Sequence, residues 1–507
     1  MTAAADLVLT GGEVHALTEP DRTAEAVAVR DGRIVRLGSA HEIGFLTGVE
    51  TRVVDLGGRV LLPGFVDAHT HLPRVGRFEV HADLRDASGV DDVVRRLRAA
   101  DDGAGWVLGY GFDESRWGGP MPDRHDLDAV AADRPVAAFR EDVHTAVVNG
   151  AALDALSDLP RADVRTEGGE PSGVLVESAV GALSDAVAPD RAETRDLLLA
   201  ARDAAHRRGV TAVQDVIQRD HPPAVYRDLA AAGDLDLRVQ CLYHHERLDA
   251  MAAVGLRTGD GGPVETGAVK AFADGSVGGR TARLQEPYAD AEGRGQWLLD
   301  PDALRALVVE ADEMGYRVAV HAIGDAAVGA ALDACAATPD PGGARHRIEH
   351  AELATDDQIR RMADLSVVAS VQPNFLRWAA PGGLYEAALG DERRRRADRL
   401  GAMRDAGVRL AFGSDCMPFD PLFGLAQVVD APEPAQCLDV TAALRAYTAG
   451  GAYAAGAEDR YGTIEVGKRA DFVALDRSPW EPSTDLADID VALTVVDGEI
   501  VFDGREG

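Results

Sequence analysis

The sequence predicts an α/β protein with three parts: a closed barrel of eight parallel strands, a small β-sandwich built from both termini, and an insertion after the first barrel strand. Three observations lead to this fold class. Eight apolar runs alternate with helical stretches through the middle of the chain. Both termini carry the same kind of hairpin pattern. A long segment with its own strand-like and helical runs, residues 75–205, separates the first two apolar runs.

The two ends of the chain read as short strands joined by tight turns. Apolar pairs alternate with DG and GG turns over the first 60 residues, as in hairpin sheets. The stretch AVRDGRIVRLG near the N-terminus and TVVDGEIVFDG near the C-terminus share one pattern. We therefore expect residues 1–58 and 458–507 to form a single composite β-sandwich domain.

The central region, 59–457, has the pattern of a parallel sheet closed into a (β/α)8, or TIM, barrel. Strands of a parallel sheet are buried on both faces and read as near-continuous apolar runs. Ala-rich amphipathic stretches such as 300–315 and 355–365 follow most of the runs. The eight predicted strands are 59–71, 209–216, 237–245, 267–275, 316–325, 346–353, 366–374 and 408–415.

The segment 75–205 is predicted to be an inserted subdomain that caps the mouth of the barrel. It contains several helical stretches and a strand-like run of its own, RPVAAFRED. A connection of this length is far longer than an ordinary loop between a strand and the next helix.

The charge balance excludes several classes of partner. The chain has 85 acidic and 52 basic side chains and a net charge of −33, which repels nucleic acid and anionic lipid. Only two of the basic residues are lysines, whereas 57 of the acidic residues are aspartates. This composition is typical of a halophilic-type surface that stays hydrated in high salt, and GC-rich codon usage gives the same bias.

The cysteines, the N-terminus and the apolar runs indicate in which cellular compartment the protein is expected. The four cysteines are dispersed without CxxC spacing, so neither a disulfide framework nor a structural zinc site is predicted. The N-terminus lacks the basic region and unbroken apolar run of a signal peptide. No stretch approaches the ~18 apolar residues of a membrane span. We expect a cytoplasmic protein.

The first predicted barrel strand ends in the pattern His-Thr-His. Residues two apart on a strand point the same way, so the imidazoles of His69 and His71 project toward one point. In a barrel of this kind that point lies at the catalytic, carboxyl-terminal face. Neutral imidazole is a common metal ligand, although core or surface histidines also show this spacing.

Three more polar side chains recur at the ends of other predicted strands. His321 stands in VAVHAIGD, His350 in HRIEHAEL and Asp415 in LAFGSD. Burying so many polar groups together costs several kcal/mol each unless they share a compensating partner. A divalent metal is such a partner, and the sequence therefore predicts a metal site at the barrel mouth.

Lys270 is an independent indication, because this lysine-poor sequence places it inside the apolar run GAVKAFADG. A buried ammonium is costly, and its pKa falls. A neutral amine can take up carbon dioxide as a carbamate, which would bridge two metal ions. The alternative is a lysine paired with Asp274 or Asp415.

These motifs resemble those of the amidohydrolase superfamily, and more narrowly amidohydrolase family 3, the group of N-substituted formamide deformylase-like metal-dependent hydrolases. The resemblance runs from about residue 6 to residue 503. It implies a (β/α)8 barrel with one or two divalent ions, most simply zinc. It also implies a set of metal ligands: His69, His71, Lys270 as a carbamate formed with carbon dioxide, His321, His350 and Asp415. The matching stretches are LPGFVDAHTHL, GFDESRW, DRPVAAFREDVHTAVVN, VKAFADGSVGGRTA, VAVHAIGDAAV, HRIEHAEL, VQPNF, AFGSDCMPFDPL and GTIEVGKRADFVALD.

The expected reaction is hydrolysis of a non-peptide carbon–nitrogen bond, of N-formyl or N-acyl type, by metal-activated hydroxide. Asp415 would act as the catalytic proton acceptor and donor. His144 and Trp117, both in the insertion, are candidate substrate contacts; the alternatives are a surface residue for His144 and the insertion core for Trp117. Two other functions remain open: hydrolysis of a cyclic amide or imide ring, and a non-catalytic scaffold. A small-molecule amide is the expected partner, and a homodimer is compatible with the sequence.

Overall fold

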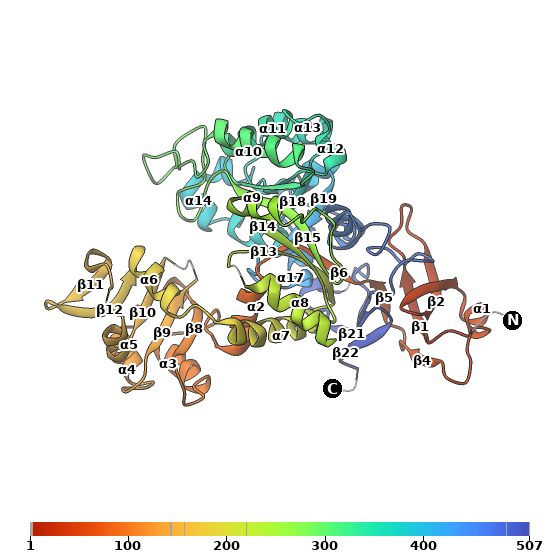
Figure 1. The fold of residues 1–507 in the computed structure, drawn as a ribbon, viewed down its shortest axis with the longest axis horizontal. Coiled ribbons are helices and arrows are strands. Elements are labelled where there is room, and N and C mark those ends of the chain that lie inside the picture. The colour runs from red at the N-terminus through yellow and green to blue at the C-terminus, as the bar shows by residue number, and fades with distance from the viewer. Residues whose placement is uncertain (1–3, 142–143, 157, 220, 483, 506–507) are drawn as a thin grey trace. The chain divides into compact units, whose positions relative to one another are not determined.

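The computed structural model describes residues 4–141, 144–156, 158–219, 221–482 and 484–505, which separate into two compact units (Figure 1). The first unit comprises Met1–Leu72 and Ala205–Gly507, and the second comprises Pro73–Ala204. The second unit is thus an insertion in the sequence of the first.

Eight parallel strands of the first unit form a nearly closed barrel. They occur at the eight predicted apolar runs and neighbour one another in the predicted chain order, so the predicted fold class is confirmed. Every residue of the first two strands is buried, as expected where both faces of a sheet are covered. The strands are β6 (Phe65–Thr70), β13 (Val210–Ile217), β14 (Arg238–His244), β15 (Val264–Phe272), β16 (Val318–Ala322), β17 (Arg347–His350), β18 (Val368–Val371) and β19 (Leu410–Phe412).

The barrel closes between β6 and β19, the first and last of these strands. The amide of Asp415 donates to the carbonyl oxygen of His69 at 2.8 Å. The buried carboxylate of Asp67 accepts from the amides of His69 (3.1 Å) and Ser414 (3.0 Å). A Cβ atom at Gly413 would lie 2.4 Å from the amide nitrogen of His69, so only glycine permits this approach.

Helices connect the barrel strands, and several begin at sequence-encoded caps. In the helix before β18, Thr355 and Gln358 form a reciprocal capping box, which satisfies amides that lack partners at a helix start. No helix within the described ranges is both long enough and apolar enough to span a membrane. The helices are α8 (Pro222–Ala232), α9 (Leu248–Ala253), α10 (Pro301–Glu313), α11 (Asp325–Cys335), α12 (Pro341–Ala344), α13 (Asp356–Asp364), α14 (Leu384–Leu389), α15 (Asp391–Arg394), α16 (Leu400–Asp405), α17 (Pro421–Val429), α18 (Val440–Arg445) and α19 (Gly451–Ala455).

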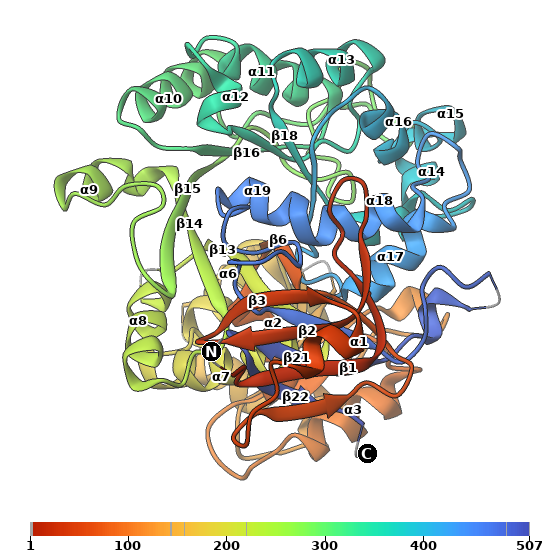
Figure 2. The same ribbon diagram turned by 90° about the vertical axis from the view of Figure 1, so that its right-hand side faces the viewer.

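Strands from both ends of the chain form one continuous sheet, in which red and blue strands lie side by side (Figure 2). The sheet curls around one core, because strands along its whole width contribute to a single buried cluster that includes Leu9, Val27, Phe472 and Leu493. Helix α1 (Ala40–Gly44) follows the third strand. The strands are β1 (Leu7–His15), β2 (Thr23–Arg30), β3 (Arg33–Gly38), β4 (Arg52–Asp55), β5 (Val60–Pro63), β20 (Phe472–Leu475), β21 (Val491–Val496) and β22 (Glu499–Asp503).

The predicted first barrel strand, 59–71, is divided between the two sheets. Its first part, β5, pairs with β1 and β20 of the terminal sheet, and only β6 belongs to the barrel. Gly64 separates the two strands, and a Cβ atom there would lie 2.3 Å from the side chain of Thr211. The division was hidden in the sequence because the apolar run of β5 continues into Phe65 and Val66 of β6, and both strands are buried throughout.

The second unit contains a sheet of six strands (Figure 1). An apolar core lies on each face of this sheet. Alternate residues of β9 (Val136–Arg140) enter the two cores, with Val136 and Ala138 in one and Ala137 and Phe139 in the other. The other strands are β7 (Ala82–Asp83), β8 (Val107–Phe112), β10 (Thr145–Val148), β11 (Val164–Glu167) and β12 (Glu170–Val176), and the helices are α2 (Leu72–Val80), α3 (Val90–Ala99), α4 (Arg124–Asp128), α5 (Gly150–Ala155), α6 (Ser178–Ala186) and α7 (Arg191–Arg207).

Candidate metal centre at the carboxyl ends of the barrel strands

The histidines of the His-Thr-His pattern lie where β6 ends, with ring centroids 5.9 Å apart. His69 is buried and His71 is partly exposed. The Nδ1 atom of His71 lies 3.3 Å from the carbonyl oxygen of Val216 at the end of β13. The Nδ1 atom of His69 lies 2.5 Å from a carboxylate oxygen of Glu349. A hydrogen-bond acceptor thus faces Nδ1 of each ring, and the Nε2 atoms are directed elsewhere.

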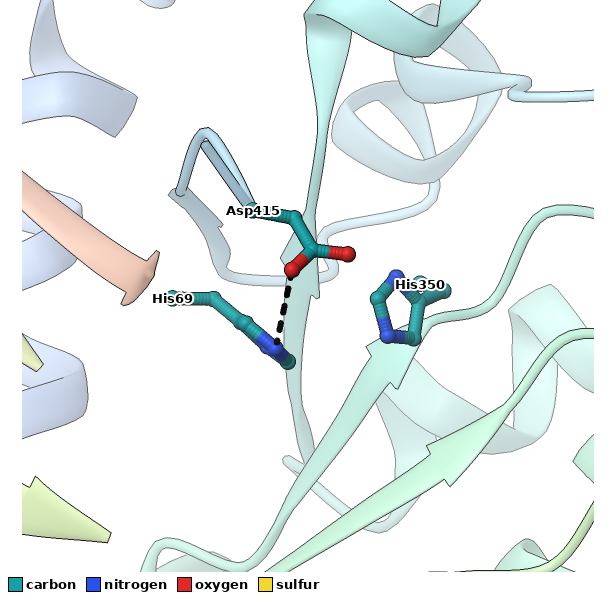
Figure 3. Close-up of side chains that lie close together, drawn as sticks. All are labelled: His69, His350 and Asp415. Carbon is teal, nitrogen blue, oxygen red and sulfur yellow. Dashed lines mark ion pairs between the residues drawn. The ribbon is translucent and has the colours of Figure 1, made fainter. Parts of the chain in front are cut away.

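Asp415 meets both Nε2 atoms just beyond β19. Its Oδ1 atom lies 3.1 Å from Nε2 of His71 and 4.0 Å from Nε2 of His69; Figure 3 draws the second contact. Burial favours the neutral acid, but the hydrogen bond from His71 and the neighbouring imidazoles outweigh it and hold the pKa of Asp415 well below its ordinary value. An ionised carboxylate is therefore available as a ligand or as a proton acceptor.

His350, at the end of β17, completes a compact group with His69 and Asp415 (Figure 3). One ligand atom from each of the three residues lies within 4.8 Å of the other two. The backbone of His350 has a φ of 72°, a conformation that non-glycine residues rarely adopt and that clusters at functional sites. Burial and the neighbouring His321 and His69 lower its pKa well below the ordinary value, so the ring is neutral.

His321, on the neighbouring strand β16, lies against His350 with ring centroids 4.5 Å apart. Its Nε2 atom lies 3.0 Å from the carbonyl oxygen of Gly275. Burial and the charge of Lys270 lower the pKa of His321 to about 3. His321 is thus a neutral imidazole beside the group of three.

Lys270 is fully buried on β15, and its Nζ atom has no hydrogen-bond partner among the described residues. The nitrogen lies 4.3 Å from the centroid of the Phe272 ring, and burial lowers its pKa to about 8. The carboxylate of Asp274 instead accepts from the amides of Arg283 (2.7 Å), Gly324 (2.9 Å) and Ile323 (3.0 Å).

A buried ion pair on β17 was not predicted from the sequence. Glu349 and Arg347 are fully buried and bonded to each other, and Glu349 also contacts His69. A signal was present: HRIEHAEL places charges inside a buried strand, the same anomaly that singled out Lys270. The sequence argument considered strand ends and passed over the residue immediately before His350.

His144 and Trp117 belong to the second unit. His144 is exposed, and its Nδ1 atom lies 3.2 Å from a carboxylate oxygen of Glu177. Trp117 packs against the core that contains Val136, and its indole nitrogen donates to the carbonyl oxygen of Pro120 at 3.2 Å. Their role toward a substrate therefore stays a prediction.

The donor set fits a divalent metal ion. Imidazole nitrogens and a carboxylate are ligands typical of zinc and related ions. The Nδ1 atom of His350 and the Nζ atom of Lys270 are buried without hydrogen-bond partners within the described ranges, a costly arrangement for polar atoms. The residues able to hold the ion are His69, His71, His350 and Asp415, with His321 and Lys270 beside them.

Comparison with known proteins agrees with this architecture. The amidohydrolase family matches residues 52–502. YtcJ of Bacillus subtilis (strain 168), whose name describes an amidohydrolase, is 32% identical over 97% of this chain and 98% of its own length. The N-substituted formamide deformylase of Arthrobacter pascens is 28% identical over 99% of both chains. A crystal structure of an uncharacterized metal-dependent hydrolase from Pyrococcus furiosus has a TM-score of 0.80 and 29% identity, covering 94% of this chain and 100% of that one. Because the family match spans most of the sequence, this protein belongs to the amidohydrolase family.

Proposed function

We propose that the protein is a metal-dependent hydrolase that cleaves a carbon–nitrogen bond in a non-peptide amide of the N-formyl or N-acyl type. The observation that carries this proposal is the group of His69, His350 and Asp415 at the carboxyl ends of barrel strands, with ligand atoms within 4.8 Å of one another. The names of the Arthrobacter deformylase and the Pyrococcus metal-dependent hydrolase support the reaction class and the metal.

Zinc is the proposed metal, because it favours nitrogen and oxygen ligands of this kind. His69, His71 and Asp415 would hold one ion, and His321 and His350 a second. A divalent ion at such a site lowers the pKa of bound water and polarises a substrate carbonyl group.

Lys270 is proposed to carry a carbamate. Because burial lowers its pKa to about 8, part of the side chain is a neutral amine near pH 7. The amine lone pair forms a bond to the carbon of carbon dioxide, and the nitrogen loses a proton to water. The product is an anionic side chain with two oxygen atoms, whereas the unmodified ammonium would place a positive charge beside the metal ligands.

Asp415 is the proposed proton carrier. Its ionised carboxylate can accept a proton from the attacking water and deliver it to the leaving nitrogen, which would otherwise depart as an unstable amide anion. His144 and Trp117 are proposed as substrate contacts.

The test measures metal content and hydrolysis in the same preparation. Protein purified without chelator is analysed for divalent metals and then assayed on N-formyl, N-acyl and cyclic amides, with product amine and acid quantified. We expect at least ~0.5 equivalents of metal, with activity on N-formyl or N-acyl compounds that is lost in Asp415→Asn. Protein without metal and without activity on any of the three classes would refute the proposal.

A further inference from the structure

The two histidines of the His-Thr-His pattern have unequal surroundings. The Nδ1 atom of His71 lies 3.3 Å from a backbone carbonyl oxygen, that of Val216. The Nδ1 atom of His69 lies 2.5 Å from a carboxylate oxygen of Glu349, a residue of β17 that is 280 positions away in the chain. One imidazole therefore faces a neutral acceptor and the other an acidic side chain.

Glu349 is held by a network inside the barrel. The guanidinium of Arg347 donates to both oxygens of Glu349, to Oγ of Ser370 at 2.8 Å, to the side-chain oxygen of Gln214 and to the carbonyl oxygen of Ala68. Arg347 and Glu349 are both 0% exposed. The arginine thus joins four strands of the barrel and leaves the carboxylate no freedom to turn away from His69.

The network determines which nitrogen of His69 carries the proton. Both oxygens of Glu349 accept hydrogen bonds from Arg347, so this side chain is engaged as an acceptor carboxylate. The contact of 2.5 Å between one of these oxygens and Nδ1 of His69 then requires the ring proton on Nδ1, because a carboxylate only accepts hydrogen bonds. The lone pair on Nε2 is then directed toward Asp415 and the candidate metal position.

We propose that Glu349 is a positioning residue that fixes the tautomer and orientation of His69 as a metal ligand, and that Arg347 holds Glu349 in place for this purpose. The inference rests on the proposed metal-dependent function. Carboxylates bonded to a ligating histidine make the ring a stronger donor, and their removal weakens metal binding about 10- to 100-fold. The two histidines therefore differ in kind: His69 has a dedicated carboxylate and His71 does not.

The first experiment replaces the carboxylate by a neutral amide of the same shape. Glu349→Gln should weaken zinc binding about 10- to 100-fold in competition with a chromogenic chelator. The matched control is Glu265→Gln, which breaks the ion pair with Arg460 at the start of β15 without touching a proposed ligand. The control should bind zinc as the wild type does. Equal affinity of Glu349→Gln and the wild type would overturn the inference.

A second readout is independent of metal. In chelated protein, the Nδ1 proton of His69 should give a downfield-shifted NMR resonance that is protected from exchange, present in Glu265→Gln and lost in Glu349→Gln and His69→Gln. Should Glu349→Gln fail to fold, Glu349→Asp keeps a negative charge for Arg347 but withdraws the oxygen from His69, and it should show the same loss. A wild type that lacks the resonance overturns the inference; a wild type that shows it but binds no zinc contradicts the proposed function instead.

Discussion

The core of the terminal sheet and the barrel near its mouth both contain fully buried side chains, but these side chains differ in chemistry. Phe472 and Leu493 fill the sheet core and are 0% exposed. At the mouth, Lys270 and Glu349 are equally buried, and His69 nearly so. Apolar burial stabilises a fold by itself, whereas polar burial costs free energy unless a partner compensates it. The first region should therefore control stability, and the second should control metal binding and reaction.

The largest expected effect is at Lys270. Lys270→Ala should lower activity about 10³-fold or more, because the proposed anionic bridge is lost from a preorganised site. Lys270→Arg should be as inactive, since guanidinium forms no carbamate. Added propionate should restore part of the rate in Lys270→Ala only. The control is the chain's other lysine, in Lys468→Ala, which removes a contact with Glu465 and should keep full activity.

Steady-state hydrolysis with metal content measured in parallel tests this prediction. An active Lys270→Arg variant with full metal content would remove the bridging role and leave a site of histidines and Asp415.

Phe472→Ala tests the apolar core of the terminal sheet. Removing this ring from the sheet core should lower the free energy of unfolding by about 3–5 kcal/mol through lost burial and the cavity left behind. Zinc affinity of the folded fraction should equal that of the wild type. Urea denaturation and chelator competition measure the two quantities, and a variant with weakened zinc binding would show that the two regions are coupled.

Removing the metal tests the same comparison through the stability of the fold. At a free zinc concentration 100 times the dissociation constant, binding stabilises the fold by about 2.7 kcal/mol, and chelation should remove this. Phe472→Ala should show the same zinc-dependent shift in Tm from a lower starting point. Asp415→Asn should show little shift. Thermal melts with and without chelator that coincide for the wild type would contradict the prediction.

The smallest expected effect is at the seam between β6 and β19. Gly413→Ala should cost about 1–3 kcal/mol, because the new Cβ would lie 2.4 Å from the amide of His69 and force the strands apart. Zinc affinity should fall as well. Gly181→Ala, in α6 where nothing lies within 4 Å, should instead gain up to ~1 kcal/mol from helix propensity. Equal zinc affinity in both variants would show that the packing between β6 and β19 does not affect the metal centre.

The barrel could be predicted from the sequence because its strands are buried on both faces and so read as apolar runs. The same property concealed the division at Gly64, where one apolar run serves two sheets. The group of His69, His350 and Asp415 was recognised because strand ends of a barrel converge. Glu349 was missed because the sequence argument considered only strand ends, whereas this residue lies one position before the end of β17 and meets His69 from inside the barrel.

The contact between β6 and β19 also determines when the metal centre can form during protein synthesis. Asp67 and Ser414, which join β6 to β19, are 347 positions apart in the chain. Contacts so distant in sequence form late, because the closure of a long loop must be completed before they contribute. A nascent chain that still lacks Asp415 contains His69, His71, His321 and His350 but not the carboxylate that meets both Nε2 atoms of the His-Thr-His pattern. The complete metal site therefore forms only after a ribosome has made most of the polypeptide.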